Sequence, residues 1–216
     1  MGALSEDNIG KVLEWSYNKV IEGIPGTDTA YELADSYLEK NLNIDQDIDS
    51  LINWQTTKCA TSGFITGLGG VITLPVAIPA NIASLIYVQM RMVASIAHLR
   101  GYDDHVQTFV YACLTGQSVA EVVKSAGVKI GLNVGEAQVK RIPTQVLVKI
   151  NQKVGFRLVT KFGQKGIINL GKMVPVLGGV IGGSFDVVST KTIATAAKRT
   201  FKLNGYDKDR NVIKTM

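Results

Sequence analysis

The sequence predicts an all-α protein, a multi-helix bundle built from helical hairpins. Apolar residues recur mostly at intervals of three and four, which is the spacing of one helix face, and sustained alternation of apolar and polar residues is missing. Glycine and proline interrupt the apolar stretches, as expected where one helix ends and the next begins. With 216 residues, the chain falls in the size range of a single domain with its own core.

The first 58 residues predict three helices with solvated faces. In the first, residues 5–22, Ser5 is the expected N-cap and the apolar face comprises Ile9, Val12, Leu13, Tyr17 and Val20. The segment 23–26, Gly-Ile-Pro-Gly, ends this helix. A second helix follows Thr27 or Asp28, and a third starts between Asp45 and Asp49. We expect residues 1–58 to pack as acidic helices on a helical core of residues 59–216, within one compact domain.

A long uncharged segment follows, from Cys59 to Met90. It has enough residues to cross a bilayer, but Gly69, Gly70, Pro75 and Pro79 would break a single helix. Two buried helices are therefore expected, the second over residues 80–99 and ended by a glycine C-cap at Gly101. Partial insertion of this hairpin into lipid is the alternative.

Further helices are expected over residues 105–115, 117–132 and 144–162. The segment 174–183 then repeats the glycine and proline character of the earlier one, with helix breaks predicted at Pro175, Gly178, Gly179, Gly182 and Gly183. Each of the two segments precedes a helix of about 20 residues that ends in Gly-Tyr-Asp, which suggests a duplicated hairpin unit.

Charge is strongly segregated along the chain. The formal net charge is +5, but residues 1–58 carry −7, residues 59–121 carry −1 and residues 122–216 carry +13. The basic half would repel itself unless it faces the acidic half or an external anion such as lipid phosphate.

The basic residues of one predicted helix share a face. Four-residue spacing advances about 40° around a helix at each step, so these residues wind along one side: Lys149, Lys153, Arg157, Lys161 and Lys165. A parallel apolar stripe comprises Val146, Ile150, Val154, Leu158 and Phe162. This cationic amphipathic helix predicts binding to an anionic membrane surface or to an acidic or membrane protein partner.

Two lone charges stand in otherwise apolar helices, Arg91 and Asp186. Because a buried unpaired charge is costly, we expect them to form an ion pair across the core. Local pairing of Asp186 with Lys191 or Thr190, or exposure to water, is the alternative.

A weaker candidate is a metal site at His98, Asp103, Asp104 and His105, although their spacing matches no recognised pattern.

Nothing in the sequence forms a catalytic triad or a cofactor motif. The only cysteines, Cys59 and Cys113, lie in apolar sequence and predict buried reduced thiols, which favours a reducing compartment. The first residues lack the pattern of a signal peptide. The basic half has few aromatic residues and no nucleic-acid-reading motif, which argues against nucleic-acid binding.

The glycine and proline segments and the helices that follow them read GLGGVITLPVAIP, IYVQMRMVASIAHLRGYD and GKMVPVLGGVIGGSFDVVSTKTIATAAKRTF, and together they span most of residues 59–205. In these stretches the chain resembles the EcsC protein family. The resemblance implies a bacterial intracellular protein, linked by the family's naming to an ABC transporter operon. The family tends to carry asparagine at the position of Asp186.

Taken with the basic helix, these features predict a non-catalytic protein at the inner face of the cell membrane, peripheral or partly inserted, that modulates a transporter or another membrane partner. One alternative is a soluble enzyme or small-ligand carrier with a cavity between the hairpins. Another is a toxin or immunity-type factor that inserts its glycine-rich segments.

Overall fold

A computed structural model describes residues 6–38, 43–60, 80–102, 106–127, 143–162 and 178–202. Across these ranges the chain forms eight α-helices and no strand, which confirms the all-α prediction; one isolated bridge joins Ile24 and Thr27. The helices are α1 (Glu6–Glu22), α2 (Ala30–Leu38), α3 (Ile44–Ala60), α5 (Ala80–Leu99), α6 (Gln107–Cys113), α7 (Val119–Ser125), α8 (Thr144–Phe162) and α10 (Gly178–Thr200). Duplication of a hairpin unit stays a prediction.

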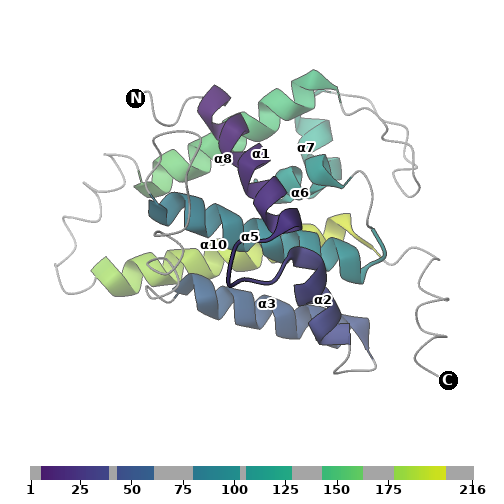
Figure 1. Cartoon of the computed structure of the whole chain (residues 1–216). Coiled ribbons are helices and arrows are strands. Elements are labelled where there is room, and N and C mark those ends of the chain that lie inside the picture. The colour runs from purple at the N-terminus through teal and green to yellow at the C-terminus, as the bar shows by residue number, and fades with distance from the viewer. Residues whose placement is uncertain are drawn as a thin grey trace.

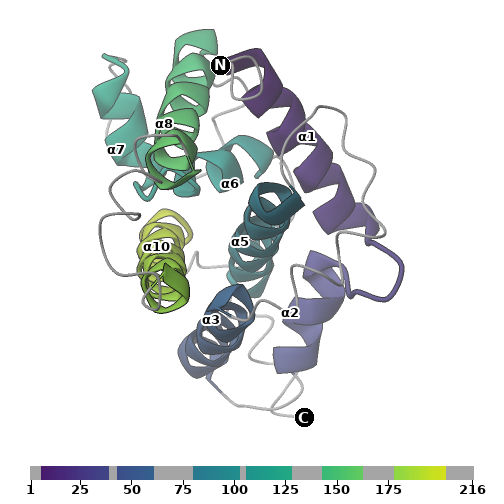
Figure 2. The same ribbon diagram turned by 90° about the vertical axis from the view of Figure 1, so that its left-hand side faces the viewer.

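Helix α5 forms the centre of the bundle (Figure 2). It packs against α1, α2, α3, α6 and α10, and every side chain from Ile82 to Ala97 is buried. Packing on all sides explains why this helix carries apolar residues on every side rather than along one stripe. The largely apolar composition of α5 therefore reflects its place in the core.

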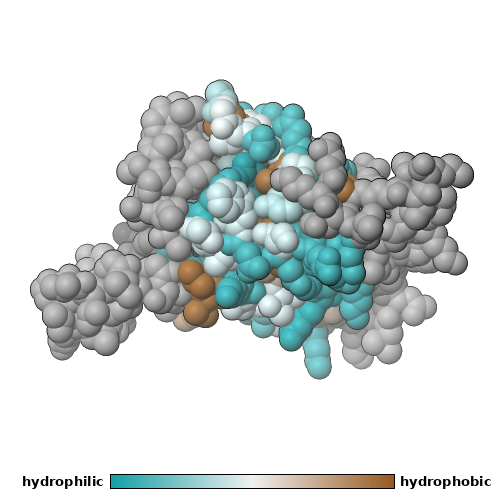
Figure 3. All heavy atoms as spheres, turned by 90° about the horizontal axis from the view of Figure 1, so that it is seen from below, coloured by the Kyte–Doolittle hydropathy of each residue, from teal (hydrophilic) through white to brown (hydrophobic). Residues whose placement is uncertain are grey.

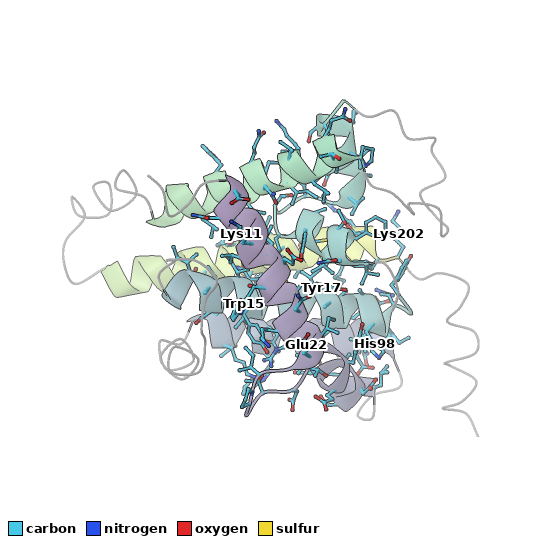
Figure 4. The ribbon with its side chains drawn as sticks, turned by 45° about the horizontal axis from the view of Figure 1, so that its top comes forward. Lys11, Trp15, Tyr17, Glu22, His98 and Lys202 are labelled. Atoms are coloured by element: carbon cyan, nitrogen blue, oxygen red, sulfur yellow. The ribbon has the colours of Figure 1, made fainter. Side chains whose placement is uncertain are left out.

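Helices α2 and α8 lie on opposite sides of α5 (Figure 1). Helix α8 packs against α1, α6 and α7, whereas α2 and α3 cover the opposite side of α5. Helix α1 connects the two sides, with Lys11 near α8 and Glu22 near α2 (Figure 4). The acidic N-terminal helices are thus integral parts of the bundle.

Local sequence determines most helix ends. Helix α1 ends at Glu22 and is followed by Gly23 with φ +89°, a conformation that favours glycine. Thr29 caps α2 in a capping box with Glu32: Thr29 Oγ1 accepts from Glu32 N at 3.1 Å, and Glu32 Oε2 accepts from Thr29 N at 2.9 Å. The helix predicted to follow Thr27 or Asp28 therefore begins slightly later, after Thr29.

The predicted end of α5 is confirmed. Gly101 has φ +81°, and its N–H donates to His98 O at 2.9 Å, while Tyr102 N donates to Ala97 O at 2.9 Å. This pair of hydrogen bonds is a Schellman motif. The helix predicted over residues 117–132 is shorter, because α7 ends at Ser125 and Gly127 then takes φ +73°.

The late glycines do not break the chain as predicted. Helix α10 begins at Gly178, so Gly179, Gly182 and Gly183 lie within its first turns. Each interior glycine costs a helix about 1 kcal/mol relative to alanine, and tertiary packing can override a preference of that size. The other predicted breaks, Gly69, Gly70, Pro75, Pro79 and Pro175, lie outside the described residues.

Within the described residues, two ion pairs join the acidic helix α3 to basic residues later in the chain. Lys198 Nζ of α10 lies 2.7 Å from Asp49 Oδ1 of α3, and Arg100 Nη2 lies 2.5 Å from Asp45 Oδ1. The face formed by α2 and α3 is largely hydrophilic, with a small hydrophobic area (Figure 3). Part of the segregated charge is therefore neutralised within the fold.

Candidate functional site

Helix α8 carries the predicted apolar stripe on its inner side. Val146, Ile150, Val154 and Leu158 are all buried against the bundle. Gly155 lies at the crossing with α1, where a Cβ added to it would meet Ile9 Cγ1 at 3.5 Å; at Gly10 of α1 a Cβ would meet Asn151 Nδ2 at 3.2 Å. Gly10 thus permits a close approach, whereas a Cβ at Gly155 would make an ordinary contact, and the packing of α1 against α8 compensates for the low helix propensity of both glycines.

The basic residues of α8 do not form one solvent-facing surface. Arg157 is directed into the bundle: Nη1 donates to Leu114 O at 2.5 Å, and Nη2 donates to Gln89 Oε1 at 2.7 Å. Burial lowers the pKa of its guanidinium to about 10. Arg157 therefore connects α8 to α5 and to the end of α6.

Lys153 also contacts a neighbouring helix. Its ammonium donates to Gln117 Oε1 and, at 2.9 Å, to Ser125 Oγ of α7. Desolvation by burial lowers the pKa of Lys153, the positive charge of Lys149 lowers it further, and Glu121 partly opposes both effects. These two hydrogen bonds go to uncharged acceptors.

Residues spaced by four do not point in the same direction from an α-helix. The resulting rotation along α8 explains why Arg157 points inward. Between Lys149 and Arg157 the side-chain direction rotates by about 80°, which carries the later residue into the sector of the buried stripe. Lys161 lies in α8, but its side chain is not among those described, and Lys165 lies outside the described residues.

The outer face of α8 is defined here by Val148, Lys149, Gln152 and Phe156. Among the described residues, Phe156 is the most exposed large hydrophobic side chain, at 72%, and Val148 is 42% exposed. Lys149 is half-buried and lies beside Val148. Residues at four-residue spacing are neighbours on a helix, so this face combines two exposed apolar side chains with a lysine.

Arg91 belongs to a polar stripe along one side of α5, with Tyr87, Ser95 and His98. Arg91 is only 2% exposed; its Nη1 donates to Asp28 O at 3.0 Å, and its guanidinium lies 5.6 Å from the centre of the Tyr87 ring. Ser95 Oγ donates to Ala30 O at 2.8 Å. These contacts attach α5 to the α1–α2 turn and to α2.

The predicted Arg91–Asp186 ion pair stays a prediction. The contacts of Arg91 lie on the α2 side of α5, whereas Gln89, two residues earlier, contacts α10 through a 3.1 Å hydrogen bond from its Nε2 to Thr190 Oγ1. Asp186 lies one helical turn before Thr190, on the same side of α10.

The sequence alone had suggested no role for Gln89, and had suggested Thr190 only as an alternative local partner of Asp186. The available signal was a polar amide within an apolar helix, because such a group requires a buried hydrogen-bond partner.

The weak metal candidate is only partly described. His98 Nε2 lies 3.1 Å from Asp35 Oδ1 at the C-terminal end of α5 (Figure 4), while Asp103, Asp104 and His105 lie outside the described residues. Within the part of the chain that the structure covers, no three His, Cys, Asp or Glu side chains are grouped as metal ligands would be.

One described helix passes a length and composition test for a membrane span. This is the 18-residue window Ile82–Leu99 of α5, of which 94% is buried in the bundle. Core helices of soluble proteins pass the same test, so this is weak evidence for a span.

Comparison with known proteins places the chain in a family. No match was found among curated proteins or among solved structures. The EcsC protein family matches residues 12–203, so the match begins within α1 and includes the acidic N-terminal helices that the resemblance had left out. Over most of its length, from α1 to the end of α10, this chain belongs to the EcsC protein family.

Proposed function

We propose that this protein is an interaction protein that attaches to the inner face of the cell membrane through the outer face of α8, where it modulates a transporter or another membrane partner. The observation that carries the proposal is the 72% exposure of Phe156 on a helix that also presents Val148 and Lys149. An aromatic ring, an aliphatic side chain and a lysine on one helix face suit the boundary between headgroups and acyl chains.

The energies are consistent with reversible attachment. Burial of a large apolar side chain contributes about 1.5–3 kcal/mol, and a lysine near an anionic surface adds about 1 kcal/mol. Lys153 and Arg157 contribute less than the sequence alone suggested, because their side chains are used inside the bundle. The burial of α5 in the core favours attachment at the surface over insertion of that helix.

Co-sedimentation with vesicles tests the proposal. The full chain is mixed with vesicles of phosphatidylcholine alone or of equal parts phosphatidylcholine and phosphatidylglycerol, at low and high salt. We expect binding only to the anionic vesicles, weakened by salt and by either Phe156→Ser or Lys149→Glu.

Matched controls lie on α10, a different helix. Val188→Ser removes another exposed apolar side chain, 64% exposed, and Lys191→Glu reverses the charge of a lysine that is exposed. Both control variants are expected to bind like the unmodified chain. Equal losses in the α8 and α10 variants, or equal binding to neutral vesicles, would contradict a role for the α8 outer face.

A further inference from the structure

Helices α3 and α5 carry a second group of polar side chains, remote from α8. The Arg91 cluster is defined here as Gln55, Lys58 and Arg91. Gln55 is completely buried, and neither its Nε2 nor its Oε1 has a hydrogen-bond partner within the described residues. The Nε of Arg91 is likewise buried without a partner in that part of the chain. A buried amide without partners and a buried guanidinium N–H without an acceptor are each costly, and such groups are rare in native proteins.

The helix register brings these side chains to one level. Arg100 and Asp45 pair, and α3 and α5 pack side by side (Figures 1 and 2). The two helices run in opposite directions. Gln55 follows Asp45 by ten residues and Arg91 precedes Arg100 by nine, so both lie about 14–15 Å from the Asp45–Arg100 pair along the helix axes. Lys58 lies one turn beyond Gln55 on α3.

Lys58 is half-buried, so the Arg91 cluster reaches the protein surface at this residue. Its ammonium lies 5.3 Å from the centre of the Trp54 ring, and Trp54 is 52% exposed. Burial lowers the pKa of Lys58, and the positive charge of Arg91 lowers it further, while Asp28 opposes both effects. Two cations therefore repel each other at this level of the bundle, and an anion between them would be stabilised by both.

We propose that the Arg91 cluster binds a phosphate group, with Arg91 and Lys58 contacting its oxygens and Gln55 donating from its amide. Planar guanidinium groups and ammonium groups are the usual phosphate ligands in proteins. The phosphate comes either from a small soluble ligand or from a lipid headgroup, and both sources present the same oxygens.

Thermal unfolding of the full chain tests the proposal, with inorganic phosphate titrated at constant ionic strength against chloride. A ligand that binds only the folded state raises the unfolding midpoint. We expect phosphate to raise the midpoint, and Lys58→Met to weaken phosphate binding by at least about tenfold. Lys191→Met on α10 is the control and is expected to respond like the unmodified chain. Gln55→Leu provides a second variant that keeps both cations and is also expected to reduce the phosphate response.

A second arm uses vesicles containing phosphatidic acid, with the Phe156→Ser and Lys149→Glu substitutions present so that attachment through α8 does not contribute. A response lost on Lys58→Met, in either arm, supports the phosphate site and identifies its source. If neither free phosphate nor vesicles give a response that depends on Lys58 and Gln55, the proposal is wrong, whatever the outcome for α8.

Discussion

Arg157 of α8 donates a hydrogen bond from Nη2 to Oε1 of Gln89 in α5, over 2.7 Å, and Gln89 in turn donates to Thr190 of α10. Three helices far apart in the sequence are thus joined by a polar connection within a mostly apolar core. Buried polar connections of this kind favour one arrangement of helices, because partners left unpaired are costly.

Substitution of Arg157 tests the strength of this connection. Arg157→Met removes the donor to Gln89 and to Leu114 O, and we expect the free energy of unfolding to fall by about 2–3 kcal/mol. Lys153→Met is the matched control and is expected to cost less than about 1 kcal/mol, since its ammonium is more accessible to solvent. Urea unfolding measures both, and equal costs for the two variants would refute the distinction.

A double-mutant cycle can identify the partner of Asp186. Thr190, one turn after Asp186, contacts Gln89, which contacts Arg157, so we expect Asp186→Asn and Arg157→Met to couple by about 1 kcal/mol or more. The competing cycle combines Asp186→Asn with Arg91→Met. Coupling in that cycle instead, measured by urea unfolding, would support the ion pair predicted from sequence.

Alanine substitution at two glycines is expected to change the stability in opposite directions. Gly155 is helical, and its added Cβ would make an ordinary contact with Ile9 at 3.5 Å, so Gly155→Ala is expected to stabilise by about 0.4–1 kcal/mol. Gly101 has φ +81°, so Gly101→Ala is expected to destabilise by about 1–2 kcal/mol. Thermal melts of the two variants should shift in opposite directions, and destabilisation by Gly155→Ala would show that the α1–α8 crossing has no room for a methyl group.

The thiol of Cys113 should be unreactive in the folded protein. Burial raises its pKa to about 12, so the reactive thiolate is scarce at pH 8. Reaction with Ellman's reagent is expected only after urea unfolding. The pKa in the folded state lies above the unfolded value of 9.0, so the stabilisation from the protonated thiol is complete below pH 9 and is lost as the pH rises toward 12. Rapid reaction of Cys113 in native protein, measured with Cys59→Ala as background, would contradict this environment.

Residue-level signals predicted the local structure well. The boundaries of α5 and α8 agree with residues 80–99 and 144–162, because apolar periodicity and a glycine C-cap act within one helix. Prediction was poorer for α7, whose C-terminal glycine was overlooked, and for α10, where three interior glycines looked like breaks but are helical. In α10 the helix forms despite the low helix propensity of glycine.

Local sequence patterns did not predict the directions of the side chains in the candidate sites. The basic spacing of α8 was visible in the sequence, but the inward direction of Arg157 depended on which side of the helix meets α5 and α6. Arg91 was recognised as a buried charge, yet its contacts with Asp28 and Tyr87 follow from the way α5 faces the α1–α2 turn.

By itself, the sequence determined the helical class, the ends of most helices, the apolar stripe of α8 and the segregation of charge, since each depends on residues close together in the chain. Only the tertiary structure decided which charges face solvent, which polar groups meet across the core, and that the buried amide of Gln55 has no hydrogen-bond partner in the described chain. The reason is physical: the direction of a side chain acquires an energy only when a distant helix supplies, or fails to supply, its hydrogen bonds and desolvates it.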